Sequence, residues 1–142
     1  AELLENPKII VPNFVIVSDN PDKPGRLTSI DSIAKNEAIF DVSLESFTDL
    51  EAILMNAGTI LWNGPLGFFE KENFDKGTIK IAKMICSSKG FSVAGGGDTI
   101  AAAQKAGVLG KLDYVSTAGG AFLEFMEGRK LPGVEALIDK VN

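Results

Sequence analysis

Two glycine-rich segments of the 142-residue chain carry residue types that can bind phosphate groups. The first reads FSVAGGGDTI over residues 91–100, and the second reads STAGGA over residues 116–121. In each segment an apolar run typical of a buried strand precedes the glycines, and a run with helical spacing follows them. Glycine lets backbone N–H groups approach an anion closely, and the positive end of a helix dipole favours negative charge there. The pattern predicts an anion site, and a tight strand-to-helix turn without a ligand is the alternative.

Asp98 and Thr99 directly follow the first set of glycines. The hydroxyl groups of Thr99 and Thr117 could donate to phosphate oxygens. A carboxylate would repel a phosphate, so Asp98 is expected either to cap the helix or to bind Mg²⁺, which prefers oxygen ligands and bridges to phosphates. Both interpretations stay open. Neither segment has the Gly-Lys-Ser/Thr of a Walker A loop or the spaced glycines of a dinucleotide loop.

A third segment, WNGPLGFFE over residues 62–70, could contact the rest of a nucleotide. Asn63 ends a predicted strand and could reach a phosphate. Pro65 offers a rigid apolar edge for a sugar or a base, and Glu70 could accept hydrogen bonds from both hydroxyls of a ribose. The alternative is a plain turn with a solvated Glu70.

Strand-like and helix-like runs alternate along the chain, which predicts an α/β fold: a parallel sheet with flanking helices. The predicted strands span residues 8–18, 38–42, 59–62, 91–94 and 114–117, and the predicted helices span 46–57, 75–89, 98–106, 119–127 and 134–141. Residues 19–26 are predicted to form a polar loop. All three segments described above follow predicted strands, and the carboxyl ends of parallel strands are where such sheets bind ligands.

The composition limits the possible functions. A formal charge of −5 argues against binding to nucleic acid or to an anionic membrane surface. The chain has no histidine, which excludes histidine-based acid–base chemistry and histidine metal ligands. The single cysteine, Cys86, excludes an internal disulfide framework and fits a reducing compartment. No apolar run reaches the length of a membrane span.

Four motifs in order resemble the C-terminal part of phosphoglycerate kinases: LWNGPLGFFE, AGGGDT, STAGGAFLEF and EGRKLPGVEAL. The resemblance implies a cytoplasmic, glycolytic enzyme with two α/β domains, which transfers a phosphoryl group between 1,3-bisphosphoglycerate and ADP. In reverse it uses 3-phosphoglycerate and ATP. It further implies that residues 1–142 are a partial, Rossmann-like nucleotide-binding domain. Because the opening AELLEN looks like the end of a helix, we expect a fragment of a longer chain.

The resemblance also implies roles for individual residues. Asp98 falls on the aspartate that binds magnesium, and Gly119 and Gly120 fall on the helix start that meets the transferring phosphoryl group. The residues that fall on nucleotide contacts of the family are Asn63, Pro65, Glu70, Gly96, Gly97, Asp98 and Thr99. The implied cofactor is Mg²⁺ together with ATP or ADP.

The chain departs from the family pattern at two places. Ala118 stands where the family has the first of three glycines, and Asp41-Val42-Ser43-Leu44 stands for Asp-x-Gly-Pro in a loop expected near the base pocket. The family's phosphate-binding lysine and its phosphoglycerate-binding domain have no counterpart in this sequence. We therefore expect the isolated chain to be inactive. The alternative is a non-catalytic nucleotide-binding or assembly module derived from the same fold.

Overall fold

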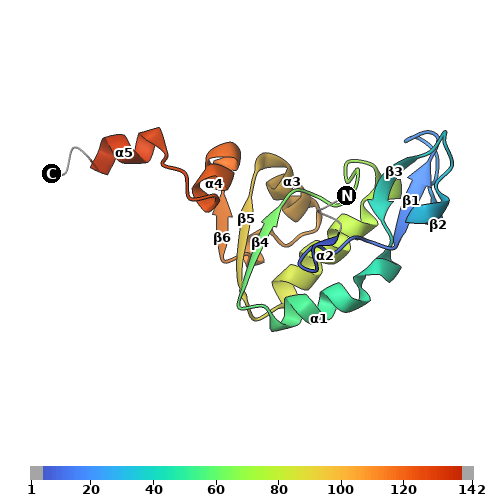
Figure 1. Cartoon of the computed structure of the whole chain (residues 1–142), viewed down its shortest axis with the longest axis horizontal. Coiled ribbons are helices and arrows are strands. Elements are labelled where there is room, and N and C mark those ends of the chain that lie inside the picture. Colours follow the sequence, from blue (N-terminus) through green and yellow to red (C-terminus); the bar gives the residue numbers. More distant parts are fainter. Residues whose placement is uncertain (1–4, 139–142) are drawn as a thin grey trace.

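The computed structural model describes residues 5–138 and contains two three-stranded sheets that follow each other along the chain (Figure 1). The first sheet is antiparallel and has the order β2-β1-β3. The second is parallel and has the order β4-β5-β6. The strands are β1 (Phe14–Ser18), β2 (Arg26–Ser29), β3 (Ala38–Val42), β4 (Thr59–Asn63), β5 (Phe91–Gly95) and β6 (Tyr114–Ser116).

The helices accompany the parallel sheet. They are α1 (Thr48–Asn56), α2 (Lys76–Ser87), α3 (Gly97–Lys105), α4 (Gly119–Met126) and α5 (Pro132–Ile138). Short 3-10 turns occupy Ile30–Ser32, Leu44–Phe47, Glu72–Phe74 and Leu109–Lys111. The predicted opening helix end lies mostly outside the described residues, as does the end of the predicted helix 134–141. No helix among residues 5–138 has the length and apolarity to cross a bilayer.

The antiparallel sheet corrects the prediction that every strand belongs to one parallel sheet. Of the strand predicted over residues 8–18, only β1 forms. The prediction missed β2, because residues 19–26 were predicted to form a polar loop and no strand was expected directly after it. Residues 19–25 are too few for the crossover that parallel strands need, so β1 and β2 must pair as a hairpin. The prediction over residues 38–42 matches β3, which pairs antiparallel with the other edge of β1.

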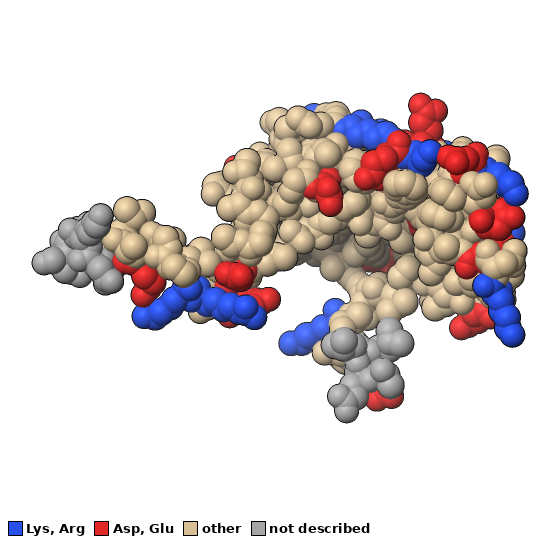
Figure 2. Space-filling model, turned by 90° about the horizontal axis from the view of Figure 1, so that it is seen from above, with Lys and Arg blue, Asp and Glu red and all other residues tan. Residues whose placement is uncertain are grey.

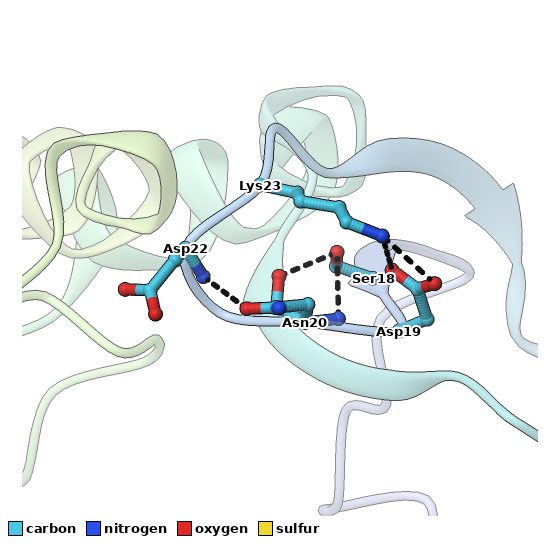
Figure 3. Close-up of polar contacts among 5 residues, drawn as sticks. All are labelled: Ser18, Asp19, Asn20, Asp22 and Lys23. Carbon is cyan, nitrogen blue, oxygen red and sulfur yellow. Dashed lines mark hydrogen bonds and ion pairs between the residues drawn. The ribbon is translucent and has the colours of Figure 1, made fainter.

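Polar side chains close the turn that follows β1 (Figure 3). Ser18 Oγ donates to the carbonyl oxygen of Asn20 at 2.8 Å. The N–H of Asp22 donates to Asn20 Oδ1 at 2.8 Å, and Lys23 forms an ion pair with Asp19 at 3.2 Å. The short polar side chains satisfy the backbone locally, which explains why this stretch turns sharply between two strands.

The parallel sheet and its helices confirm the predicted α/β architecture. Phe91 of β5 pairs with Thr59 of β4, and Tyr114 of β6 pairs with Val93 of β5. Four residues of α2 share one face of the helix by their spacing, and all four are buried: Thr78, Ile81, Ala82 and Ile85. The three apolar residues among them belong to one core cluster with the inward residues of the sheet, which include Ile60, Trp62 and Ala94.

A buried carboxylate joins the two sheets. Asp41 of β3 is only 1% exposed, and its Oδ2 accepts the N–H of Gly77 in the first turn of α2 at 2.9 Å. A Cβ atom on Gly67 or Gly77 would fall inside van der Waals distance of this carboxylate, so both glycines leave room for it. Burial raises the pKa of Asp41, and the N–H donors of Gly77 and Val42 oppose that rise. Asp41 thus ties the first sheet to the helix that packs on the second.

One face of the parallel sheet is open to solvent. Leu61 is 40% exposed, Phe91 52% and Tyr114 55%, and their register places them on the same side. Among residues 5–138, no strand pairs with the outer edges of β4 and β6. Because an apolar face beside open strand edges favours association, the isolated chain is expected to bury this surface against another molecule.

We therefore expect the 142-residue chain, produced alone, to self-associate. Light scattering at increasing protein concentration should show a rising mean mass, and Leu61→Lys, which places a charge on the open face, should lower it. Glu51→Lys on the exposed side of α1 is the control and should leave association unchanged. A strictly monomeric wild type at high concentration would contradict this expectation.

Candidate nucleotide-binding site

The two glycine turns lie side by side at the carboxyl end of the parallel sheet. β5 ends at Gly95 and β6 at Ser116, and these two residues are paired in register. The N–H of Gly96 donates to the carbonyl oxygen of Ser116 at 3.4 Å. A Cβ atom on Gly119 would lie 3.4 Å from the Cα atom of Gly96, so the backbones of the two turns are in contact. The sheet therefore brings the N-termini of α3 and α4 to one place.

Gly96 gives the first turn its shape. Its φ angle is 96°, a conformation that residues with a side chain rarely adopt. It is the N-cap residue of α3, and no side chain caps this helix. The backbone N–H groups of the first turn, which have no partner inside the helix, thus stay available for a ligand.

The position of Asp98 rules out one of its two predicted roles. Asp98 is not the N-cap, because α3 begins at Gly97 and places it second in the helix. Its side chain is exposed. The described residues contain no cluster of three potential metal-ligating side chains, so Asp98 would share a metal ion with at most one further such side chain among residues 5–138. This donor set fits Mg²⁺, which usually keeps several waters and binds one or two carboxylates plus phosphate oxygens.

The hydroxyl of Thr99 lies inside the site rather than at its surface. Thr99 is 1% exposed; its Oγ1 donates to the carbonyl oxygen of Gly95 at 2.7 Å and accepts the N–H of Gly64 at 2.7 Å. This bridge fixes the start of the loop after β4 against α3. The hydroxyl proton that the sequence suggested for a phosphate is therefore directed at the Gly95 carbonyl.

Asn63 faces the same carbonyl from β4. Its Nδ2 donates to the Gly95 oxygen at 2.7 Å, so that oxygen accepts from two side chains. A Cβ atom on Gly96 would lie 3.4 Å from Asn63 Nδ2. The amide thus borders the first glycine turn, and its role beside phosphates stays a prediction.

The loop between β4 and α2 carries Pro65 and Glu70. Gly64 begins it with a φ angle of 92°, and its carbonyl oxygen accepts the indole N–H of Trp62 at 2.8 Å. The hydroxyl of Thr78 in α2 accepts the N–H groups of Leu66 and Gly67, at 3.1 and 3.2 Å. These bonds hold Pro65 in place from both sides.

Glu70 projects from the same loop. Its side chain is exposed, although the ring of Phe69, the residue before it, is buried. The ammonium group of Lys105 in α3 donates to the carbonyl oxygen of Phe69 and pairs with Asp75 at 2.9 Å. Sequence reasoning missed Lys105 because its partners lie 36 and 30 positions away, beyond the reach of any local pattern.

The second turn contains the family departure at Ala118. Its φ angle is −91°, so the methyl group requires no strained backbone. Behind this turn, the ring of Phe122 in α4 covers Gly95, where a Cβ atom would lie 2.3 Å from the ring. Gly119 and Gly120 are the first two residues of α4, and no side chain of the N-cap residue hydrogen-bonds to this helix start.

The chain was compared with known protein families and solved structures. The family model described as phosphoglycerate kinase matches residues 2–129. The chain belongs to the phosphoglycerate kinase family. Its fold matches phosphoglycerate kinase from Coxiella burnetii with a TM-score of 0.82 and 44% identity, over 88% of this chain and 33% of that one. The enzyme from Pyrococcus horikoshii OT3 gives a TM-score of 0.77 and 37% identity, over 89% of this chain and 32% of that one.

Both glycine turns lie in the part of the chain that matches the phosphoglycerate kinase family. The chain spans about a third of the length of these two kinases. The parallel sheet and all the predicted site residues, from Asn63 to Gly120, lie within the matched residues 2–129.

The Thr99 bridge yields a stability prediction. Thr99→Val removes the hydroxyl and leaves the N–H of Gly64 without its acceptor, so we expect a loss of about 1–3 kcal/mol in the free energy of unfolding. Thr99→Ser keeps the hydroxyl and should recover most of that loss. Urea denaturation of the 142-residue chain measures both variants. Equal stability of the valine and serine variants would contradict the role of the hydroxyl.

Proposed function

We propose that this chain is the C-terminal, nucleotide-binding part of a glycolytic phosphoglycerate kinase that acts in the cytoplasm. The enzyme would transfer a phosphoryl group between 1,3-bisphosphoglycerate and ADP, or from ATP to 3-phosphoglycerate in reverse. The observation that carries the proposal is the contact between two glycine turns, each opening a helix, at the end of one sheet. Two helix N-termini aimed at one place suit the chain of phosphates in a nucleotide.

Each site residue has a part in this proposal. The N–H groups of Gly97 and Thr99 bind the phosphates of the nucleotide. Gly96, whose N–H donates to Ser116, shapes the turn that presents them, and Asn63 borders them. Pro65 supports the nucleoside, and Glu70 accepts hydrogen bonds from the ribose hydroxyls. Asp98 is the residue that would hold Mg²⁺, and the ion would neutralise part of the charge on the phosphates.

Gly119 and Gly120 orient the phosphoryl group that moves. In the direction of ATP synthesis, a terminal phosphate oxygen of ADP bonds to phosphorus while the bond from phosphorus to the acyl oxygen breaks. The N–H groups at the start of α4 would stabilise the equatorial oxygens as charge spreads over them. These contacts use only backbone, which agrees with the absence of side chains on both glycines.

The few basic residues between positions 89 and 121 indicate that residues outside this sequence complete the site. Between residues 89 and 121 the basic residues are Lys89, Lys105 and Lys111, and Lys105 is already paired with Asp75. Acidic and basic side chains are interspersed on the face drawn in Figure 2, without a continuous basic patch. Phosphoryl transfer needs concentrated positive charge, so we assign the binding of phosphoglycerate to residues outside this sequence, in a longer chain of which residues 1–142 are a partial domain.

An activity assay separates the kinase from a non-catalytic module. The 142-residue chain alone is expected to show no turnover in an assay that couples ATP formation from 1,3-bisphosphoglycerate and ADP to a detectable product. The longest natural chain that carries this sequence should turn over. Nucleotide binding without turnover by that longer chain would support the module instead.

Asp98→Asn tests the metal role. If Asp98 holds Mg²⁺, this variant should bind free ADP about as well as wild type and gain less from added Mg²⁺. We expect a coupling of roughly 1–3 kcal/mol between the metal and the residue. Titration calorimetry of ADP with and without Mg²⁺, on the longest natural chain, gives the four affinities for each variant pair.

Asp49→Asn is the matched control for this test. Asp49 is exposed and occupies the second position of α1, as Asp98 does in α3. The control should therefore reproduce any general effect of removing a carboxylate from a first helical turn. A magnesium gain in Asp98→Asn equal to that of wild type and of Asp49→Asn would refute the metal role.

A further inference from the structure

The loop that carries Glu70 is attached to α3 at both ends of that helix. At the start of α3, Thr99 Oγ1 accepts the N–H of Gly64, the first residue of the loop. At the end of α3, the ammonium group of Lys105 donates to the carbonyl oxygen of Phe69 and pairs with Asp75 at 2.9 Å. One helix therefore fixes both ends of the segment that contains Pro65 and Glu70.

The Lys105 bridge is better shielded than the other ion pair of this loop. The side chain of Asp75 is 10% exposed and that of Lys105 30%. Lys71, next to Glu70, pairs with Asp22 at 2.6 Å, but these side chains are 44% and 73% exposed. Exposed pairs contribute little to holding a geometry, whereas charged hydrogen bonds to shielded partners contribute more. Lys105 is thus the stronger of the two charged tethers beside Glu70.

The length of α3 sets the distance between the phosphate-binding turn at Thr99 and the tether at Lys105. Thr99 and Lys105 are six residues apart, which is about 9 Å along a helix that rises 1.5 Å per residue. Thr99 belongs to the glycine turn proposed to bind phosphates, and Lys105 holds the carbonyl group immediately before Glu70. A ribose joined to those phosphates must reach Glu70 across this fixed separation.

Resting on the proposed function, we propose that Lys105 is a positioning residue that holds Glu70 at ribose distance from the phosphate-binding turn. Lys105 donates to the backbone and to Asp75 and acts on the nucleotide only through the loop. Its loss should therefore weaken recognition of the ribose hydroxyls and leave recognition of the phosphates intact.

Ligands that lack one part of the nucleotide test this division. Calorimetry on the longest natural chain compares ADP, 2′,3′-dideoxy-ADP and inorganic pyrophosphate. In Lys105→Met, which keeps the apolar stem and loses the charge, we expect ADP to bind roughly tenfold more weakly, as a loss of about 1.4 kcal/mol implies. The affinities for dideoxy-ADP and pyrophosphate should stay within twofold of wild type, by the same conversion about 0.4 kcal/mol.

Three further variants complete the design. Glu70→Gln should show the same selective loss, and the double variant Glu70→Gln, Lys105→Met should lose little more than either single one, because both remove one interaction. Lys83→Met, an exposed lysine of α2, is the control for charge and should leave all three affinities unchanged. Asp75→Asn keeps the lysine and weakens the bridge, so it should show a smaller selective loss even if Lys105→Met folds poorly.

The outcomes separate the two proposals. An equal loss of affinity for ADP and pyrophosphate in Lys105→Met would mean a general structural role and overturn the positioning role. The positioning role would also be overturned if Lys105→Met and Asp75→Asn both prefer ADP over dideoxy-ADP by the same factor as wild type. If wild type binds ADP and dideoxy-ADP equally well, the ribose role of Glu70 is refuted and the role of Lys105 falls with it. If wild type binds neither, the nucleotide site itself is refuted.

Discussion

The carbonyl oxygen of Gly95 is the acceptor on which the candidate site depends. It receives Asn63 Nδ2 from β4 and Thr99 Oγ1 from α3, both at 2.7 Å. Through the Thr99 hydroxyl it is also connected to the N–H of Gly64, where the next loop begins. A strand end, a helix start and a loop start thus share one hydrogen-bonded cluster around the buried residues Gly95 and Thr99. Since buried polar groups must find partners, the three segments cannot move independently.

The parts of the fold that could be predicted follow local patterns. Continuous apolar runs gave β4, β5 and β6, and helical spacing gave the buried face of α2. The glycines after β5 and β6 indicated two turns at one edge because parallel strands end together. For helix 46–57 the pattern was less exact: the first residues form a 3-10 turn, and Ile53, whose spacing puts it on the helix face of Leu50 and Leu54, is 50% exposed.

The parts that could not be predicted depend on contacts distant in sequence. Arg26 and Thr28 do not alternate with apolar residues in a recognisable strand, yet they pair with β1 because the chain turns back after Ser18. The capping role considered for Asp98 failed because Gly96, with its positive φ, already ends the turn. Lys105 carries no motif, and only the packing of α3 beside the loop gives it partners. From the sequence, Asp41 was expected in a loop near the base pocket. In the structure its carboxylate accepts a hydrogen bond from α2 and so links the first sheet to the second.

The glycines at positions 95 and 96 are required for different reasons, and this affects how the sequence can vary. Glycine is required at position 96 by the positive φ angle of the backbone. A substitution elsewhere in the protein therefore does not relieve the strain that a side chain would cause there. Glycine is required at position 95 only because the ring of Phe122 occupies the volume that a Cβ atom would need. Among relatives, position 96 should therefore be invariant by itself. Positions 95 and 122 should instead covary, with a larger residue at one accompanied by a smaller residue at the other.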